Sequence, residues 1–229
     1  GGGVVAAGAR PPAGGASPGA ADPGAARVGG GGVVPPADGT SRAAAEQRTV
    51  VPSSPEGPVV EVGLGRPRQR LHGVGAALTE SSAKLLADLP AAERRAVIEE
   101  LFDPQRGGLS VLRLAIGASD FSLEHRSLAD SAWPASSPLS TFSIERDRRW
   151  VIPVLREILQ VNPDIEIVAS PWSAPGWMKD SGSYLYGILL RTQEANYARY
   201  LVAFVQAYRE LGIDVNWLTV QNEPAAVQL

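Results

Sequence analysis

The sequence predicts an α/β fold, and within that class a (β/α)8 TIM barrel that is truncated after about its fourth strand. From residue 59 onward, short apolar runs alternate with longer segments of helical periodicity, which is typical of repeated βα units and a parallel sheet. Polar residues directly follow several of these runs, as they do at the carboxyl ends of barrel strands. A doubly wound sheet is the alternative, but its glycine-rich phosphate turn finds only a weak match, at residues 73–75.

The first 58 residues differ in composition from the rest, and we expect them to form a disordered tail. More than half of them are Gly, Ala or Pro, and none is Phe, Trp, Tyr, Leu, Ile or Met. All aromatic residues of the chain lie from Phe102 onward. A segment with so little apolar surface to bury cannot offset the entropy cost of folding.

The ordered part is expected to begin with a strand at residues 59–64. A second strand is predicted over residues 71–79, because the run is apolar and lies between turn signals. Residues 81–102 then have helical character, with a break at Leu89-Pro90, where proline removes a backbone donor and clashes with the preceding turn.

The remaining predicted elements continue the alternation. Strands are predicted at residues 109–116, 165–169 and 215–220, where β-branched residues are frequent. A helix is predicted over residues 144–159. The clearest helix covers residues 193–211, since large apolar side chains recur there at steps of three and four: Tyr197, Leu201, Phe204, Tyr208 and Leu211. Gly212 supplies its C-terminal stop.

Composition excludes several classes of function. The net charge is −3 and the first 60 residues are neutral, so we expect no nucleic-acid partner. The chain has no cysteine, and His72 and His125 have no partner at metal-ligand spacing, so neither a metal nor another cofactor is expected. No run approaches the roughly 18 apolar residues of a transmembrane segment. No signal peptide is visible, although the Ala/Arg-rich start would also suit a transit peptide.

Glu223 is the strongest candidate for a catalytic residue. It follows the predicted strand 215–220 in the sequence Asn222-Glu223-Pro224. A partly desolvated carboxylic acid at a strand end can donate a proton to a leaving oxygen. The adjacent Asn222 can hydrogen-bond a sugar 2-hydroxyl group. The structural alternative is that Asn222 caps a helix and Pro224 occupies its first turn.

Other strand ends carry further candidates. Trp172 and Trp177 flank a Pro/Gly-rich loop after strand 165–169, and Trp172, nearer the strand, is predicted to stack on a sugar ring. Asp120 follows strand 109–116, where it can accept hydrogen bonds from sugar hydroxyl groups or cap the next turn. Glu80 either faces the same pocket or caps the following helix.

These segments together resemble glycoside hydrolase family 30, the glucosylceramidase-like retaining β-glycosidases. The resemblance covers about residues 59–229. It rests on five motifs in the family's order: HGVGAALTESSA (72–83), ASDFSLE (118–124), FSIERDRRWVIPVLRE (142–157), ASPWSAPGWMK (169–179) and LTVQNEPAA (218–226).

The resemblance implies a catalytic barrel with a flanking β-sandwich. Residues 59–70 would form a sandwich strand and a linker, and residues 71–229 the N-terminal half of the barrel. By the same match Glu223 would be the general acid/base, Asn222 the partner of the sugar 2-hydroxyl group, and Asp120 and Trp172 contacts to the sugar.

The resemblance also implies an activity and a setting. The expected reaction is hydrolysis of glucosylceramide to glucose and ceramide, a step of sphingolipid metabolism. A β-xylanase or an endo-β-1,6-glucanase is the alternative within the family. A secreted or lysosomal location is implied, with peripheral membrane contact through a lipid substrate.

Two departures from the family pattern matter. The loop at residues 180–190 only partly resembles the family's glycine-rich loop, so the resemblance does not determine the geometry of the substrate subsites there. A retaining glycosidase also needs a second carboxylate about 5–5.5 Å from the acid. The family carries this nucleophile at the end of the seventh strand, and the sequence stops at Leu229. We therefore expect the chain to be a fragment without its nucleophile; an inactive, sugar-binding half-barrel is the alternative from another functional class.

Overall fold

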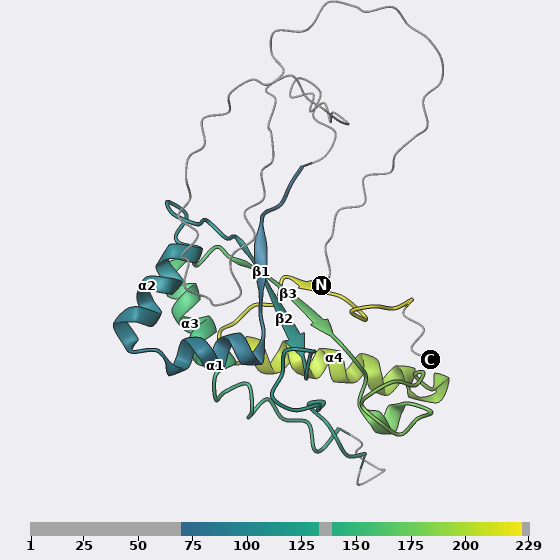
Figure 1. Ribbon diagram of the computed structural model, residues 1–229. Helices are drawn as coiled ribbons and strands as arrows, with labels where there is room; N and C mark the ends of the chain where they lie inside the picture. Colours follow the sequence, from purple (N-terminus) through teal and green to yellow (C-terminus); the bar gives the residue numbers. More distant parts are fainter. Residues whose placement is uncertain (1–69, 133–138, 226–229) are drawn as a thin grey trace, which may run out of the picture. The chain divides into compact units, whose positions relative to one another are not determined.

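The computed structural model describes residues 70–132 and 139–225, which contain a four-stranded parallel sheet (Figure 1). The strands follow one another in the order β1-β2-β3-β4, as repeated βα units require. They are β1 (Gly75–Leu78), β2 (Val111–Ile116), β3 (Glu166–Pro171) and β4 (Trp217–Leu218). The expected tail at residues 1–58 and all but the last residue of the expected strand and linker at 59–70 lie outside the described residues.

Helices connect the successive strands. They are α1 (Glu80–Asp88) and α2 (Ala91–Phe102) between β1 and β2, α3 (Val151–Val161) between β2 and β3, and η1 (Gly176–Met178), η2 (Arg191–Gln193) and α4 (Glu194–Arg209) between β3 and β4. The expected partial (β/α) barrel is thus confirmed. None of the helices in the described residues is long and apolar enough to cross a lipid bilayer.

The core lies between the helices and one face of the sheet. Side chains alternate in burial along β2, with Leu112, Leu114 and Ile116 in the core and the residues between them on the other face. The largest core side chains from α4 are Tyr200, Phe204 and Tyr208, all fully buried. This alternation places Arg113 on the second face of β2, away from the core.

The close approach of β1 to β2 explains a glycine in the first strand. A Cβ atom at Gly75 would lie 1.9 Å from the carbonyl oxygen of Val111. Only glycine therefore fits without moving the two strands apart.

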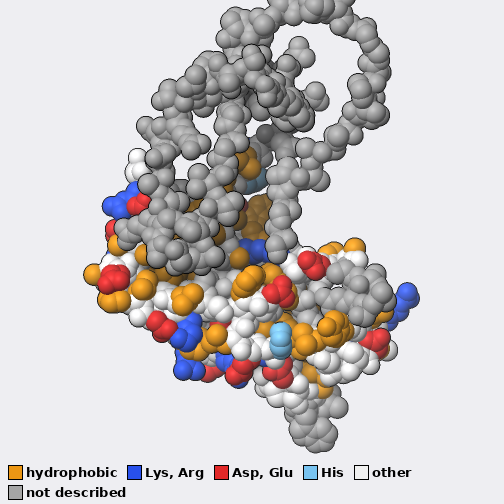
Figure 2. Space-filling view, in the orientation of Figure 1, with side chains coloured by type: hydrophobic (Ala, Val, Ile, Leu, Met, Phe, Trp, Pro, Cys, Tyr) orange, Lys and Arg blue, Asp and Glu red, His pale blue; other side chains and the backbone are white. Residues whose placement is uncertain are grey.

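The predicted break in the first helical segment is confirmed. α1 ends at Asp88 and α2 begins at Ala91, with Pro90 at its N-cap. Thr79 caps α1 in a reciprocal arrangement with Ser82. α1 and α2 both carry acidic and basic side chains. Figure 2 shows acidic and basic side chains interspersed on the face of the molecule that is turned toward the viewer.

The third predicted helix was placed too early. α3 begins at Val151, whereas residues 144–150 form turns. Pro153 explains the late start, because its ring would clash with the carbonyl group of Arg149 if the helix extended further toward the N-terminus. Asp147 also turns inward and is buried, so this segment has a packing role of its own.

The last helix is confirmed, and the last strand is shorter than predicted. α4 ends at Arg209, and Gly212 follows with a φ of 76°, as a C-terminal stop requires. β4 starts late because the Asn216 side chain accepts the backbone hydrogen bond of Ile167 (2.7 Å). Beyond β4 the chain still follows β3, since the Asn222 N–H donates to the Pro171 carbonyl group (2.9 Å).

Candidate active site at the carboxyl ends of the strands

A cavity of about 740 Å³ lies at the carboxyl ends of β2, β3 and β4. All four residues of the predicted site line it: Asp120, Trp172, Asn222 and Glu223. They come from three segments that are far apart in the sequence, and parallel strands bring their ends to the same edge of the sheet. The volume is typical of a site for a small molecule, which occupies about 300–1,000 Å³.

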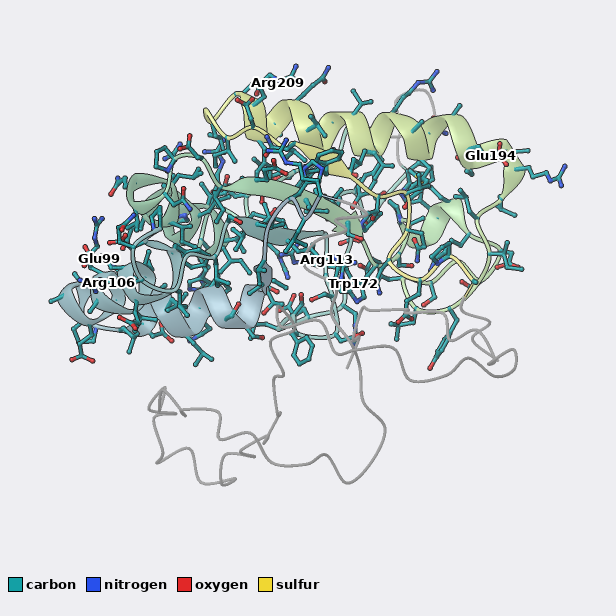
Figure 3. All side chains as sticks on the ribbon, turned by 90° about the horizontal axis from the view of Figure 1, so that it is seen from above. Glu99, Arg106, Arg113, Trp172, Glu194 and Arg209 are labelled. Carbon is teal, nitrogen blue, oxygen red and sulfur yellow. The ribbon has the colours of Figure 1, made fainter. Side chains whose placement is uncertain are left out.

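Arg113 is a site residue that the sequence reasoning missed. It lies on the face of β2 opposite the core and donates from Nη2 to Asn222 Oδ1 (2.6 Å) and Ser170 Oγ (3.0 Å). Its guanidinium carbon lies 4.6 Å from the ring centre of Trp172, and Figure 3 shows the two side chains next to each other. The available signal was a charged residue at an alternate position of an otherwise apolar strand.

The segment after β4 is fixed to β3 by further hydrogen bonds. Ser170 Oγ lies 2.6 Å from Thr219 Oγ1, and the Gln221 side chain donates to the carbonyl oxygen of Trp172 (2.7 Å). Together with the backbone bond of Asn222, these contacts determine where Asn222 and Glu223 lie at the rim of the cavity.

The two tryptophans have different environments. Trp177 Nε1 donates to the Ala129 carbonyl oxygen (2.7 Å), and its ring packs against the core. Trp172 Nε1 is buried and has no hydrogen-bond partner among the described residues. A buried donor without a partner costs about 1–3 kcal/mol of stability.

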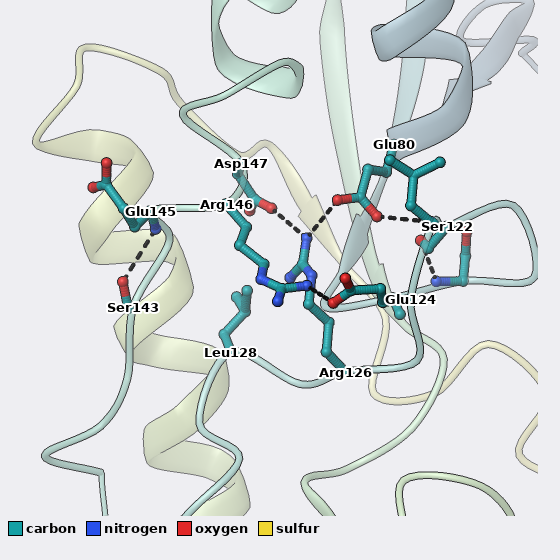
Figure 4. Close-up of polar contacts among 12 residues, drawn as sticks. Glu80, Ser122, Glu124, Arg126, Leu128, Ser143, Glu145, Arg146 and Asp147 are labelled. Atoms are coloured by element: carbon teal, nitrogen blue, oxygen red, sulfur yellow. Dashed lines mark hydrogen bonds and ion pairs between the residues drawn. The ribbon is translucent and has the colours of Figure 1, made fainter.

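Glu80 does not line the cavity, so the interpretation that it faces the pocket is wrong. Its side chain is buried and accepts a hydrogen bond from Arg126 Nη2 (3.2 Å), as Figure 4 shows. It also accepts one from the backbone N–H of Leu123 (3.1 Å). Thr79, not Glu80, caps α1. Glu80 therefore links α1 to the segment after β2.

The acidic groups of the site are accessible to a ligand. Asp120 and Glu223 are both exposed in the lining of the cavity. Asp180 also lines it, but its Oδ1 accepts a hydrogen bond from the Ile188 N–H (2.7 Å). Within residues 70–132 and 139–225, no three His, Cys, Asp or Glu side chains are arranged to hold a metal ion.

Comparison with known proteins supplies further findings. The family model for the glycosyl hydrolase family 30 TIM-barrel domain matches residues 71–229. An endo-1,6-beta-D-glucanase of Neurospora crassa is 32% identical over 162 residues, which are 69% of this chain and 34% of the relative. The lysosomal acid glucosylceramidase of Mus musculus is 28% identical over 165 residues, 69% of this chain and 32% of the relative.

Solved structures show the same similarity. An endo-beta1,6-glucanase structure matches with a TM-score of 0.64 and 34% identity, over 69% of this chain and 36% of that structure. The crystal structure of SrfJ from Salmonella typhimurium matches with a TM-score of 0.66 and 30% identity, over 70% of this chain and 36% of that one. The chain spans about a third of the length of the relatives that it matches.

Proposed function

Since the chain belongs to glycosyl hydrolase family 30, we propose that the protein hydrolyses β-glucosidic bonds with retention of configuration, at the cavity described above. One observation carries the proposal: Asp120, Trp172, Asn222 and Glu223, which follow three different strands, line a single cavity. These are the residue types that bind sugar hydroxyl groups and rings and transfer a proton to a glycosidic oxygen.

In this proposal each residue has a separate role. Glu223 protonates the glycosidic oxygen as the bond to the leaving group breaks, and later removes a proton from the attacking water. Asn222 binds the sugar 2-hydroxyl group, with its side-chain oxygen oriented by Arg113. Asp120 accepts hydrogen bonds from sugar hydroxyl groups, and Trp172 packs against the ring.

Retention also requires a nucleophile. A second carboxylate, about 5–5.5 Å from the acid, bonds to the anomeric carbon and is released when water attacks. We propose that it comes from outside the described residues, as the resemblance implies. For this reason the tests below use the complete protein.

We propose two candidate substrates. Glucosylceramide is the expectation from the sequence, and the glucosylceramidase of Mus musculus supports it. A β-1,6-linked glucan is the second candidate, because the Neurospora crassa relative and a solved structure at 34% identity are both endo-1,6-glucanases. Hydrolysis of glucosylceramide in mixed micelles, measured as glucose release, is compared with hydrolysis of β-1,6-linked glucose oligomers, measured as new reducing ends, to separate the two. Peripheral membrane contact is proposed only for the lipid substrate.

The variant Glu223→Gln tests the proposed reaction. We expect the turnover of an alkyl β-glucoside to fall about 10²–10⁴-fold, the usual contribution of general acid–base catalysis. The glycosyl transfer step on 2,4-dinitrophenyl β-glucoside should be much less affected, because dinitrophenolate leaves without a proton. Glu210→Gln, at an exposed position after α4, is the matched control.

Two results would contradict the proposal. A wild-type protein that turns over no β-glucoside excludes the activity and favours the inactive, sugar-binding alternative. Equal effects of Glu223→Gln on both leaving groups exclude the assigned role of Glu223 as the acid.

A further inference from the structure

The segment at residues 180–188 forms one wall of the cavity. It supplies six lining residues: Asp180, Tyr184, Leu185, Tyr186, Gly187 and Ile188. Tyr186 is 59% exposed and Ile188 74% exposed, so their apolar surfaces are free to contact a ligand. This wall is distinct from the strand ends that carry Asp120, Trp172, Asn222 and Glu223.

Lys179 fixes the backbone of this wall. Its side chain is only 6% exposed, and Nζ donates to the carbonyl oxygens of Tyr184 (2.6 Å) and Tyr186 (2.5 Å) and to Ser173 Oγ (2.6 Å). Three oxygen partners match the three donors of an ammonium group. Burial lowers the pKa of Lys179, whereas the nearby charge of Asp180 acts in the opposite direction. The carbonyl groups of the cavity wall therefore bind the buried ammonium group of Lys179.

The backbone of the wall has an unusual conformation at Tyr186. Its φ is 57°, in the left-handed region, which a bulky residue rarely adopts. The contacts of Lys179 with Tyr184 and of Asp180 with Ile188 hold the segment on either side of this position. Strained backbone of this kind is frequent at ligand-binding positions. The result is a carbonyl group directed at Lys179 and a tyrosine ring that remains exposed at the cavity.

We propose that Lys179 is a positioning residue for a leaving-group subsite, in which the Tyr186 ring contacts the group attached to the glycosidic oxygen. The inference rests on the proposed function, since the strand-end residues account for the glucose unit and the wall at residues 180–188 lines the same cavity from a separate segment. The subsite takes a leaving group with an apolar face, which is either the C–H face of a second sugar ring or a hydrocarbon chain. Lys179 acts through Tyr186 and does not contact the substrate.

The test compares leaving groups on the same glucose unit. The complete protein is assayed with methyl β-glucoside, with the β-1,6-linked disaccharide gentiobiose and with octyl β-glucoside. Tyr186→Asn removes the ring and retains a residue that tolerates a positive φ. We expect it to lower kcat/KM for the larger leaving group about tenfold more than for methyl β-glucoside, mainly through KM. The disaccharide and the octyl glucoside show which leaving group uses the subsite.

Further variants test whether Lys179 acts through Tyr186. Lys179→Met should reduce the same selectivity ratio, and the double variant should show no additional loss, because two residues that act as one unit are not additive. Tyr186→Phe retains the ring and should retain the ratio. Thermal unfolding of each variant confirms that it is folded.

The outcomes separate this inference from the proposed function. Three results would each overturn the subsite: equal losses on all three substrates, additive losses in the double variant, or an unchanged selectivity ratio in Tyr186→Asn. Turnover of methyl β-glucoside would in each case still support the proposed function. A protein inactive on all three substrates would overturn both.

Discussion

At the scale of single residues, Arg113 connects the parts of the site. One guanidinium group donates to Asn222 and Ser170 and stacks on Trp172, so it joins the end of β3 to the segment after β4. A planar group with several donors suits this arrangement, whereas a lysine ammonium group cannot stack and donate in the same way. The orientation of Asn222 therefore depends on a residue far from it in the sequence.

Arg113→Lys is expected to impair activity more than stability. Loss of a charge-assisted hydrogen bond costs about 1.5–3 kcal/mol, which corresponds to a loss of roughly ten- to a hundredfold in kcat/KM if Asn222 no longer meets the substrate. The measurement is kcat/KM on an alkyl β-glucoside together with the thermal midpoint. Arg209→Lys, at the exposed end of α4, is the matched control. Unchanged kcat/KM in Arg113→Lys would contradict the positioning role.

The candidate site was predictable where polar residues directly follow strands. Asn222, Glu223, Asp120 and Trp172 were found in this way, and the structure brings them to one cavity. Arg113 and Lys179 were not found, because their roles depend on partners that only the folded chain brings near. Glu80 was ambiguous for the same reason: its partner Arg126 is 46 residues away.

At the scale of elements, a buried ion network links α1, the segment between β2 and α3, and α4. Arg126 Nη2 lies 3.2 Å from Glu80 Oε1 and 3.4 Å from Asp147 Oδ1, and the Tyr208 hydroxyl group donates to Asp147 Oδ2 (3.0 Å). Figure 4 shows Arg126 between the two acidic side chains, with the Arg146–Glu124 ion pair alongside. Burial raises the pKa of Asp147, while Arg126 and Tyr208 lower it to a smaller extent.

This raised pKa predicts a pH dependence of stability. The folded state holds the Asp147 proton more tightly than the unfolded state, so its contribution is fully present below the usual pKa of 3.8 and is lost as the pH rises through the raised value. Asp147→Asn removes this titration. In urea unfolding over a series of pH values, the wild type should therefore lose free energy of unfolding relative to the variant as the pH rises from about 4. Parallel pH profiles of the two proteins would contradict the shift.

Elements were predictable where the local signal agreed with the packing. The break at Pro90 and the helix α4, with its glycine stop, follow from proline and glycine chemistry and from periodicity. The start of α3 was missed because the clash of Pro153 with the preceding turn was not applied to this segment, and because the burial of Asp147 is a tertiary effect. The start of β4 was missed because the Asn216 side chain replaces a backbone partner, which no propensity indicates.

At the scale of the whole molecule, strand order and site position follow from one property of the sequence. Alternating strands and helices predict parallel neighbours, and parallel neighbours place every strand's carboxyl end at one edge. The four described strands have this order, and the cavity lies at this edge. The chain covers about a third of its relatives, so the activity belongs to the proposal for the complete protein.

The central claim is that the cavity at the strand ends binds a β-glucoside. The most direct measurement is a crystal structure of the complete protein carrying Glu223→Gln, with an uncleaved β-glucoside bound. We predict that the glucose ring lies against Trp172 and contacts Asp120 and Asn222. We also predict that the side chain at position 223 lies within about 2.7–3.2 Å of the glycosidic oxygen. A glucoside bound outside this cavity, or inside it without these contacts, would contradict the account.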